Sequence, residues 1–329
     1  MNMKKLCLLA SLVLFSTNAI FAELVIPYGE GSGKVDYTNA NKYDEKLEDP
    51  LPFGPLSFRM IGDKTWVADS VGGKLMQFDN QGKLISEFSV LPKDVKPYTV
   101  NEEGYPDANI LIEDIAPVIS SNGDLEAWWV ADSNDNKLLK FSADGKILAQ
   151  LQDPDYGQLF RIEVGANGHL FVADKGSRKI YIYDSNGNHV NEMNWEWSGM
   201  AVSGKEENLY RLIYFNEENR NMLVSTDIKG NVIKSKVIDI EMSDPELWWV
   251  DEIKGEAVIT YTPLEGFEGQ YNIIRINLDG KVIASGKLTA PFVMNRFIDH
   301  ADYEDVFIGK CDYSEAPNGN FEIVPFKMP

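Results

Sequence analysis

Three arginines stand at comparable positions of a chain that otherwise carries an excess of acids. The sequence has 31 lysines and arginines against 51 aspartates and glutamates, a formal net charge of −20. Arg59, Arg161 and Arg296 each lie near the start of a short apolar segment, and Asp114 and Trp248 take the matching place in two further segments. Guanidinium groups bind carboxylate or phosphate through paired hydrogen bonds. Trp248 could stack on a ligand and Asp114 could orient it, so the set predicts a site for a small anionic ligand.

The same arginines could instead pair with acids of the chain itself. Glu113, Glu163 and Asp299 lie close to them in sequence. With 51 acids in the chain, ion pairs that tie separate segments together are an equally good interpretation. Many exposed ion pairs contribute little to the free energy of unfolding. The contribution of these pairs therefore depends on their burial, which the sequence leaves open.

A repeat shows which elements must position these residues. The segments 66–69, 129–132 and 171–174 read Trp-Val-Ala-Asp, Trp-Val-Ala-Asp and Phe-Val-Ala-Asp, and each is followed by a polar turn, an apolar strand and a glycine turn. The glycines of these turns continue along the chain as Gly82, Gly145, Gly187, Gly230 and Gly280. Strand–turn–strand units at a period of about 40 residues are typical of a β-propeller.

The repeats predict an all-β chain with six blades. We place them at residues 56–91, 110–152, 159–194, 198–240, 246–289 and 292–327. The last blade lacks one strand, and the apolar segment 24–28 would supply it, which closes the ring and covers an open edge. Residues 29–55 would then cross to the first blade, and 92–109 would be an insertion between blades. Residues 23–329 would form one domain.

The segment 66–88 resembles an NHL repeat in its Val-Ala-Asp strand end, its polar turn, Phe78-Asp79 and Gly82-Lys83. Residues 129–148 and 171–187 are similar to it. The resemblance implies a six-bladed propeller of the NHL type, a class with partner-binding scaffolds and, among related propellers, lactonases, lyases and strictosidine-synthase-like proteins. Fold alone does not choose among these functions.

In such a ring the innermost strands begin at the mouth of a central channel, where links from all blades converge. Aligning these starts puts six residues in one register: Arg59, Asp114, Arg161, Gly199, Trp248 and Arg296. We therefore expect the ligand site at the channel mouth, formed by the five of them that carry side chains.

Other chemical signals fail on spacing. The oxygen-rich segment 132–136 has Lys137 and Ala143 where a calcium loop needs glycine and glutamate. Residues 29–34 lack the glycine spacing and the Ser/Thr of a phosphate loop. The aspartates of the Val-Ala-Asp motif are expected to cap the turns that follow them. Of the three histidines, His300 is the one placed to act as an acid, base or ligand.

The first 22 residues read as a secretory signal peptide. Lys4 and Lys5 precede an apolar run over residues 6–15, and Ala22 is the expected cleavage site. We therefore expect a periplasmic or secreted protein. Removing the leader takes away two lysines and no acid, and such a surface repels nucleic acid and anionic lipid. Cys311 alone would remain in the mature chain, so no internal disulfide can form.

Two functions follow as hypotheses. The first is a non-catalytic binding or scaffold protein for a small anionic ligand or another exported protein, with no cofactor, no resident metal and no catalytic residue. The alternative is a divalent-metal-dependent lactonase or hydrolase of the six-bladed type, for which Glu113, Asp114 and Asp299 are the available carboxylates. The three arginines would repel a cation, which weighs against the alternative.

Overall fold

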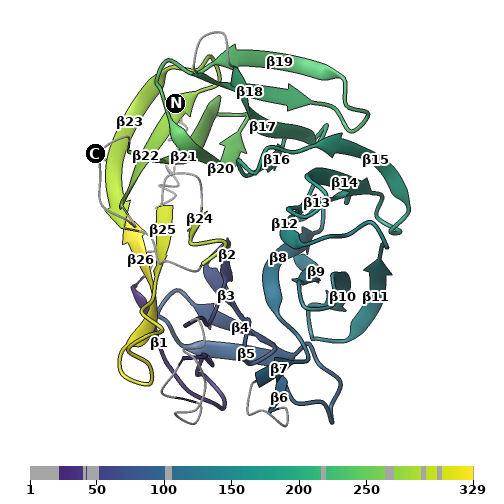
Figure 1. Cartoon of the computed structure of the whole chain (residues 1–329), viewed down its shortest axis with the longest axis vertical. Helices are drawn as coiled ribbons and strands as arrows, with labels where there is room; N and C mark the ends of the chain where they lie inside the picture. Colours follow the sequence, from purple (N-terminus) through teal and green to yellow (C-terminus); the bar gives the residue numbers. More distant parts are fainter. Residues whose placement is uncertain are drawn as a thin grey trace, which may run out of the picture.

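The computed structural model describes residues 22–39, 42, 52–100, 106–215, 220–263, 270–289, 294–301 and 306–328. Within them, strands form six four-stranded antiparallel sheets and a two-stranded ribbon. The sheets are arranged around a central axis like the blades of a propeller (Figure 1). The expected six-bladed, all-β fold is therefore confirmed. The expected leader lies outside the described residues, apart from Ala22. No helix long and apolar enough to cross a membrane occurs in the part of the chain that the structure describes.

Each blade runs from an inner strand at the axis to an outer strand at the rim. Blade one is β2 (Ser57–Ile61), β3 (Lys64–Asp69), β4 (Lys74–Asp79) and β5 (Leu84–Ser89). Blade two is β8 (Ile112–Ile119), β9 (Leu125–Asp132), β10 (Lys137–Ser142) and β11 (Ile147–Gln152). Blade three is β12 (Leu159–Val164), β13 (Leu170–Asp174), β14 (Lys179–Tyr183) and β15 (His189–Asn194).

The second half of the ring follows the same plan. Blade four is β16 (Ala201–Ser203), β17 (Asn208–Phe215), β18 (Arg220–Thr226) and β19 (Val232–Val237). Blade five is β20 (Ser243–Asp251), β21 (Glu256–Thr262), β22 (Gln270–Asn277) and β23 (Val282–Thr289). Blade six is β24 (Ile298–His300), β25 (Val306–Lys310), β26 (Asn320–Phe326) and, as outer strand, β1 (Leu24–Pro27).

The amino-terminal strand closes the ring. β1 pairs antiparallel with β26 from Leu24 opposite Ile323 to Pro27 opposite Asn320. Alternation directs Leu24 and Ile26 into the core, whereas Val25 is exposed. The free side of β1 needs no amide donor, so Pro27 is tolerated there. Closure therefore rests on one apolar face of a four-residue strand.

Aromatic side chains fill the space between neighbouring blades. Trp66 of blade one and Trp128 of blade two are buried, with their ring centroids 4.9 Å apart. Trp129, on the other side of β9, belongs to the core between blades two and three, together with Tyr181. Such ring pairs add to the free energy gained by burying apolar area. These tryptophans therefore serve packing between blades.

The Val-Ala-Asp aspartates cap turns, as expected. Asp174 is fully buried and accepts backbone hydrogen bonds from Gly157, Gln158, Gly176 and Ser177 at 2.7–3.1 Å. Asp69 and Asp132, which are also buried, accept backbone hydrogen bonds from neighbouring turns. Each carboxylate thereby joins the turn that follows it to a link between blades.

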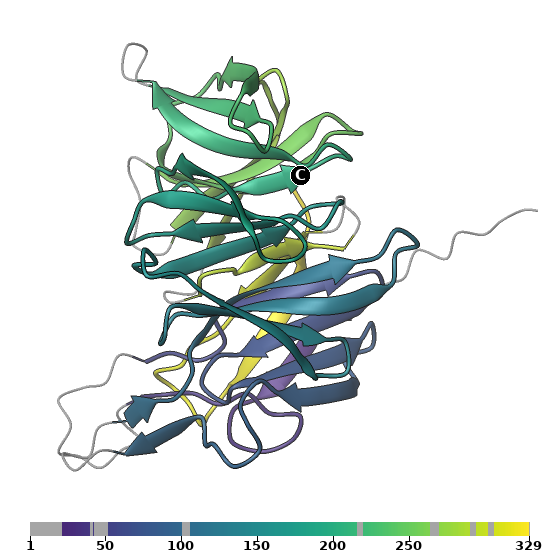
Figure 2. The same cartoon turned by 90° about the vertical axis from the view of Figure 1, so that its right-hand side faces the viewer.

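The long link between blades one and two carries an element that the sequence did not indicate. β6 (Tyr98–Val100) and β7 (Pro106–Ala108) form an antiparallel ribbon. In the side view of Figure 2 this ribbon projects from one face of the disc. We call that face the upper face: it carries the links between blades, the starts of the inner strands and the turns between second and third strands.

Candidate functional site

Three of the predicted site residues, Arg59, Asp114 and Arg296, meet on the axis. Both arginines are paired there with acids of the chain itself. Arg296 forms a two-pronged ion pair with Asp114, with Nε–Oδ1 at 3.0 Å and Nη2–Oδ2 at 2.8 Å. Arg59 donates to the carbonyl oxygens of Ile115 and Ile162 and pairs with Glu163 at 3.2 Å. Arg296 shares that glutamate at 2.9 Å. We call Arg59, Asp114, Glu163 and Arg296 the axial plug.

Burial makes the axial plug a strongly coupled unit. Asp114 is fully buried and Arg296 is 1% exposed. Burial alone would raise the pKa of Asp114, but the guanidinium groups of Arg296 and Arg59 outweigh it and hold the pKa well below its ordinary value. Ser57 Oγ and the Ile162 amide also donate to this carboxylate, at 2.6 and 3.0 Å. The pairing of arginines with chain acids, left open by the sequence, is thus what the structure shows.

Arg161 lies apart from the plug and faces blade five. Its Nη2 contacts Glu246 Oε1 at 2.7 Å and the Asn295 carbonyl at 2.8 Å. Its guanidinium carbon lies 4.2 Å from the ring centroid of Trp248, so Trp248 is covered by the protein's own cation. Burial lowers the pKa of Arg161 to about 10. Nη1 is buried and has no hydrogen-bond partner among the described residues.

Irregularities in three inner strands take bulky or charged residues out of the regular strand alternation. The pairing register shifts between Ile112 and Asp114 in β8, between Leu159 and Arg161 in β12, and between Leu247 and Trp249 in β20. The residues skipped by these shifts are Glu113, Phe160 and Trp248. A bulge turns a side chain away from the regular alternation and is frequent beside functional sites.

A pocket of about 830 Å³ opens on the upper face over blades three to five. We call it the mouth pocket. Its apolar walls include Phe160, Trp197, Tyr214 and Tyr271, and its charged residues are Lys175, Glu196, Glu241, Asp244 and Glu246. A concave site with aromatic walls and a few charged groups is the usual form of a small-molecule site.

Lys175 is the cation that lines the mouth pocket, and among the described residues no acid forms an ion pair with it. Its Nζ lies 3.4 Å from the ring centroid of Phe160. Among the described residues the ammonium group of Lys175 makes neither a hydrogen bond nor an ion pair within 4.0 Å. Burial lowers its pKa, and the charges of Glu113 and Glu246 act in the opposite direction. A partly buried ammonium in this state gains from any anion that reaches it.

The turn that carries Lys175 is rigidly placed. The Lys175 amide donates to the Gln158 carbonyl at 2.8 Å. Gly176 packs so closely on Gly157 that an added Cβ would lie 2.5 Å from the Gly157 Cα. The ammonium is therefore presented by a turn that cannot easily shift, which is what a preorganised site requires.

Trp197 stands at the edge of the mouth pocket in a strained conformation. Its φ is +59°, in the left-handed region that bulky residues rarely adopt. Half of its surface is exposed, and the Arg178 guanidinium lies 4.8 Å from its ring centroid. Next to it, Gly199 has φ +72°, and an added Cβ would meet the Leu247 carbonyl oxygen at 2.2 Å. Strain of this kind gathers at functional sites.

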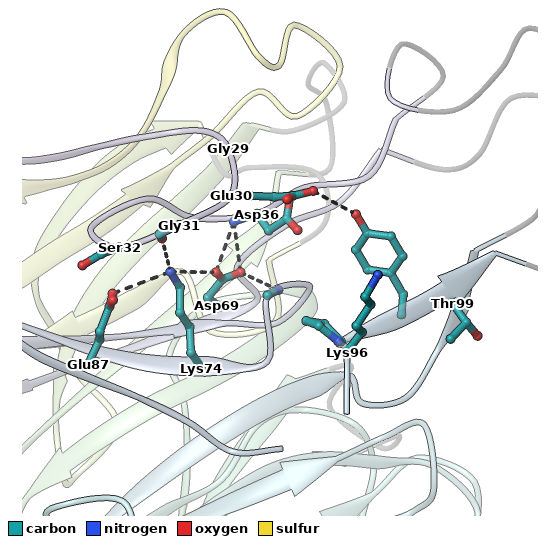
Figure 3. A pocket seen from close by; sticks show the side chains of 13 residues that line it. Gly29, Glu30, Gly31, Ser32, Asp36, Asp69, Lys74, Glu87, Lys96 and Thr99 are labelled. Carbon is teal, nitrogen blue, oxygen red and sulfur yellow. Dashed lines mark hydrogen bonds and ion pairs between the residues drawn. The ribbon is translucent and has the colours of Figure 1, made fainter. Parts of the chain in front are cut away.

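A second pocket on the upper face, of about 720 Å³, is a structural joint (Figure 3). Lys74 Nζ donates to the Gly31 carbonyl and pairs with Glu87 at 3.6 Å and Asp69 at 3.9 Å. Asp69 in turn accepts from the Asp36 and Gly72 amides. The charges of Lys74 and Asp69 hold the segment 29–36 against blade one. The other lysine of this pocket, Lys96, is exposed, whereas Lys175 of the mouth pocket is partly buried.

His300 lies at the lower end of the channel, below the axial plug. It lines a small pocket of about 220 Å³ together with Arg59, Glu163 and Asp299. Its ring packs on Trp249 with centroids 4.6 Å apart, and burial lowers its pKa. The histidine is therefore separated from the mouth pocket, and burial disfavours its charged form.

The carboxylates considered for a metal-dependent enzyme do not fit a divalent ion. Asp114 is held by Arg296 and Ser57, Asp299 accepts from the Met60 amide at 2.7 Å, and Glu113 accepts from Ser133 at 3.1 Å. In the described part of the chain no three His, Cys, Asp or Glu side chains are grouped to hold a metal. These three carboxylates are thus occupied by partners of the chain itself and do not converge on one point.

The sequence missed Lys175, Trp197 and Tyr214. For Lys175 a signal was present: it follows the Val-Ala-Asp motif of blade three, where blades one and two carry Ser70 and Ser133. Those serines bond to the Ile112 carbonyl and to Glu113. Lys175 stands where these serines stand, and a lysine cannot accept or donate the same hydroxyl hydrogen bond to the next blade. No comparable signal identifies Trp197 or Tyr214.

Comparisons with known proteins identify the fold and no more. No protein-family model matches the sequence, and no curated protein matches it. Hydrazine synthase of Kuenenia stuttgartiensis is 15% identical with a TM-score of 0.50, covering 78% of this chain and 73% of that one. A luciferin-regenerating enzyme is 12% identical with a TM-score of 0.50, covering 83% and 91%. Virginiamycin B lyase of Staphylococcus aureus, in a catalytically inactive form with quinupristin, is 17% identical with a TM-score of 0.48, covering 83% and 84%.

Proposed function

We propose that this chain is an exported propeller of the NHL type that binds a small carboxylate-bearing ligand in the mouth pocket. The observation that carries the proposal is the Lys175 ammonium, which lines that pocket without an ion-pair partner among the described residues. Arg161 contributes indirectly, because it pairs with Glu246, a carboxylate that lines the same pocket. A ligand carboxylate would compensate a charge whose burial costs free energy.

The predicted ligand contacts of Arg59 and Arg296 receive less support. Their guanidinium groups are engaged by Asp114 and Glu163, and a ligand would have to displace these carboxylates. Their role in the proposal is to fix the inner strands of blades one, two, three and six against one another. That rigid frame sets the position of Phe160 and Lys175 at the mouth.

Aromatic walls define the rest of the ligand. Trp197 and Tyr214 line the mouth pocket and are 50% and 45% exposed, so an apolar or aromatic body in the pocket can contact their exposed surfaces. Stacking and burial on such rings can contribute about 1 kcal/mol each. A ligand that joins a carboxylate to an apolar body would use the lysine and the aromatic walls together.

Matched pairs of acid and amide test the proposal. Propanoyl-L-phenylalanine, benzoylglycine and indole-3-propionate are titrated calorimetrically into the purified chain at pH 7, each beside its carboxamide. We expect at least one acid to bind about tenfold or more tighter than its amide, and Lys175→Met to abolish the difference. Lys179→Met is the matched control, because Lys179 lies in the same hairpin and pairs with Glu192 at 2.6 Å. Equal binding of every acid and amide, or unchanged binding by Lys175→Met, would overturn the proposal.

The export part of the proposal has its own test. Expression of the full sequence in a secreting bacterial host, followed by amino-terminal sequencing of the purified protein, should give Glu23 as first residue. A product that retains Lys4 and Lys5 would contradict cleavage after Ala22.

A further inference from the structure

We infer that the mouth pocket selects an amphoteric ligand, an α-amino acid or short peptide with a free carboxylate and a free ammonium group. This inference rests on the proposed function, since it adds a second recognised group to the same site. It starts from the distribution of charge in the pocket. One cation, Lys175, lies partly buried against Phe160, and three of the carboxylates that line the pocket are exposed.

The three exposed carboxylates come from the entries to blades four and five. Glu196 belongs to the link before blade four, Glu241 to the link before blade five, and Asp244 to the first residues of β20 in blade five. All three are exposed and line the pocket. We call them the acidic rim. Glu196 is oriented by the Tyr214 amide, which donates to Oε2 at 3.0 Å. Asp244 is held at φ +46°, a strained left-handed conformation.

The rim and the lysine act at separate places. The charges that shift the pKa of Lys175 are those of Glu113, Glu246 and Arg161, and no carboxylate of the acidic rim is among them. Asp244 instead raises the pKa of Tyr271, after burial and Glu246. The pocket therefore has one partly buried cation, three exposed carboxylates and several aromatic walls, while its fourth carboxylate, Glu246, is paired with Arg161.

Such a polarity matches a ligand whose own charges are separated by an apolar part. A carboxylate would reach Lys175, an ammonium group would face the acidic rim, and an apolar side chain would contact Trp197 or Tyr214. A volume of about 830 Å³ exceeds that of one amino acid and accommodates a dipeptide.

The charge of the whole chain points the same way. With a formal net charge of −20, the field of the protein repels a simple anion at long range. A zwitterion carries no net charge and is not repelled in this way. The acidic rim, which would oppose a simple anion at the last step, becomes a binding group for the ammonium end.

Four isosteric probes separate the two charges. L-alanyl-L-phenylalanine carries both, propanoyl-L-phenylalanine lacks the ammonium group, L-alanyl-L-phenylalaninamide lacks the carboxylate, and propanoyl-L-phenylalaninamide lacks both. Calorimetric titration at pH 7 and low salt measures each dissociation constant. We expect the dipeptide to bind at least about tenfold tighter than propanoyl-L-phenylalanine, and the two amides to bind weakest.

Variants identify which carboxylates respond. Glu196→Gln and Asp244→Asn should weaken the dipeptide about three- to tenfold and leave propanoyl-L-phenylalanine unchanged or slightly tighter. Asparagine tolerates the left-handed backbone of Asp244, so folding is not at issue. Glu192→Gln, an exposed acid paired with Lys179 outside the pocket, is the control and should change neither constant.

The outcomes distinguish the two claims. If propanoyl-L-phenylalanine binds through Lys175 as tightly as the dipeptide, the amphoteric ligand is wrong and the carboxylate site stands. If L-alanyl-L-phenylalaninamide binds as tightly as the dipeptide, or if no acid binds better than its amide, the carboxylate site is wrong and this inference falls with it. Unchanged dipeptide binding by both rim variants would remove the rim from recognition and overturn the inference.

Discussion

Arg296 grips Asp114 across the axis of the ring, with donor–acceptor distances of 3.0 and 2.8 Å, although 182 positions separate them in sequence. Blade six thereby contacts blade two directly. Glu163 of blade three and Arg59 of blade one complete the axial plug. Four blades are thus joined by one cluster of charges, and this joint leads to the first prediction.

Removing one partner of this pair should be costly. Arg296→Met leaves the Asp114 carboxylate buried with one guanidinium instead of two, and we expect a loss of about 3–5 kcal/mol in the free energy of unfolding. Urea titration followed by tryptophan fluorescence measures it. Lys234→Met, which breaks the exposed pair with Asp279, should cost less than about 1 kcal/mol. Similar small losses in both variants would show that the axial plug does not stabilise the ring.

Glu113 should make the stability depend on pH. Burial raises its pKa to about 7, so between pH 5 and pH 7 the folded chain retains a proton that the unfolded chain releases. The contribution of this group is therefore full below the unfolded pKa, near 4.3, and is lost as the pH rises through 7.

We expect this dependence to amount to about 2–4 kcal/mol between pH 5 and pH 8. Glu113→Gln, which keeps an acceptor for Ser133, should remove this part of the dependence, while Asp69, whose pKa burial also raises to about 7, keeps its own part. Urea titrations of both proteins at half-unit steps of pH measure the difference between them. Parallel curves for the parent and the variant would rule out the proton on Glu113.

Ring closure should depend on one face of β1. Ile26 is 1% exposed and packs in the core of blade six, whereas Val25 is 47% exposed in the same strand. Ile26→Ala should lower the free energy of unfolding by about 2–5 kcal/mol. Val25→Ala, the neighbouring control, should change it by less than about 0.5 kcal/mol. Equal effects at the two positions would mean that pairing with β26 matters and side-chain burial does not.

The fold was predictable because its signals are local. Asn/Asp-Gly turns, Val-Ala-Asp strand ends and two-residue alternation each describe one strand or turn, and their repetition gave the six blades. Even the pairing of β1 with β26 followed from counting strands, because the last blade lacked one strand and the apolar segment 24–28 could supply it. The ribbon β6–β7 was missed because its short strands lack that alternation.

The site was predictable only in part, because it depends on partners distant in sequence. Alignment brought Arg59, Asp114 and Arg296 together on the axis, whereas Arg161 lies apart from them and faces blade five. It could not show that Glu163 and Asp114 would satisfy two of the arginines, since pairing depends on distances across blades. It also could not show the register shifts at Glu113 and Phe160, the second of which lines the mouth pocket.

The pairing of β1 with β26 sets an order of events for the growing polypeptide. β1 precedes the five complete sheets in sequence and β26 follows them, so β1 has no partner until those sheets have been made. Until residues 320–326 are available, β1 presents unpaired backbone groups along the side that β26 later covers. A chain built this way is open to unwanted strand pairing at β1 until β26 is in place.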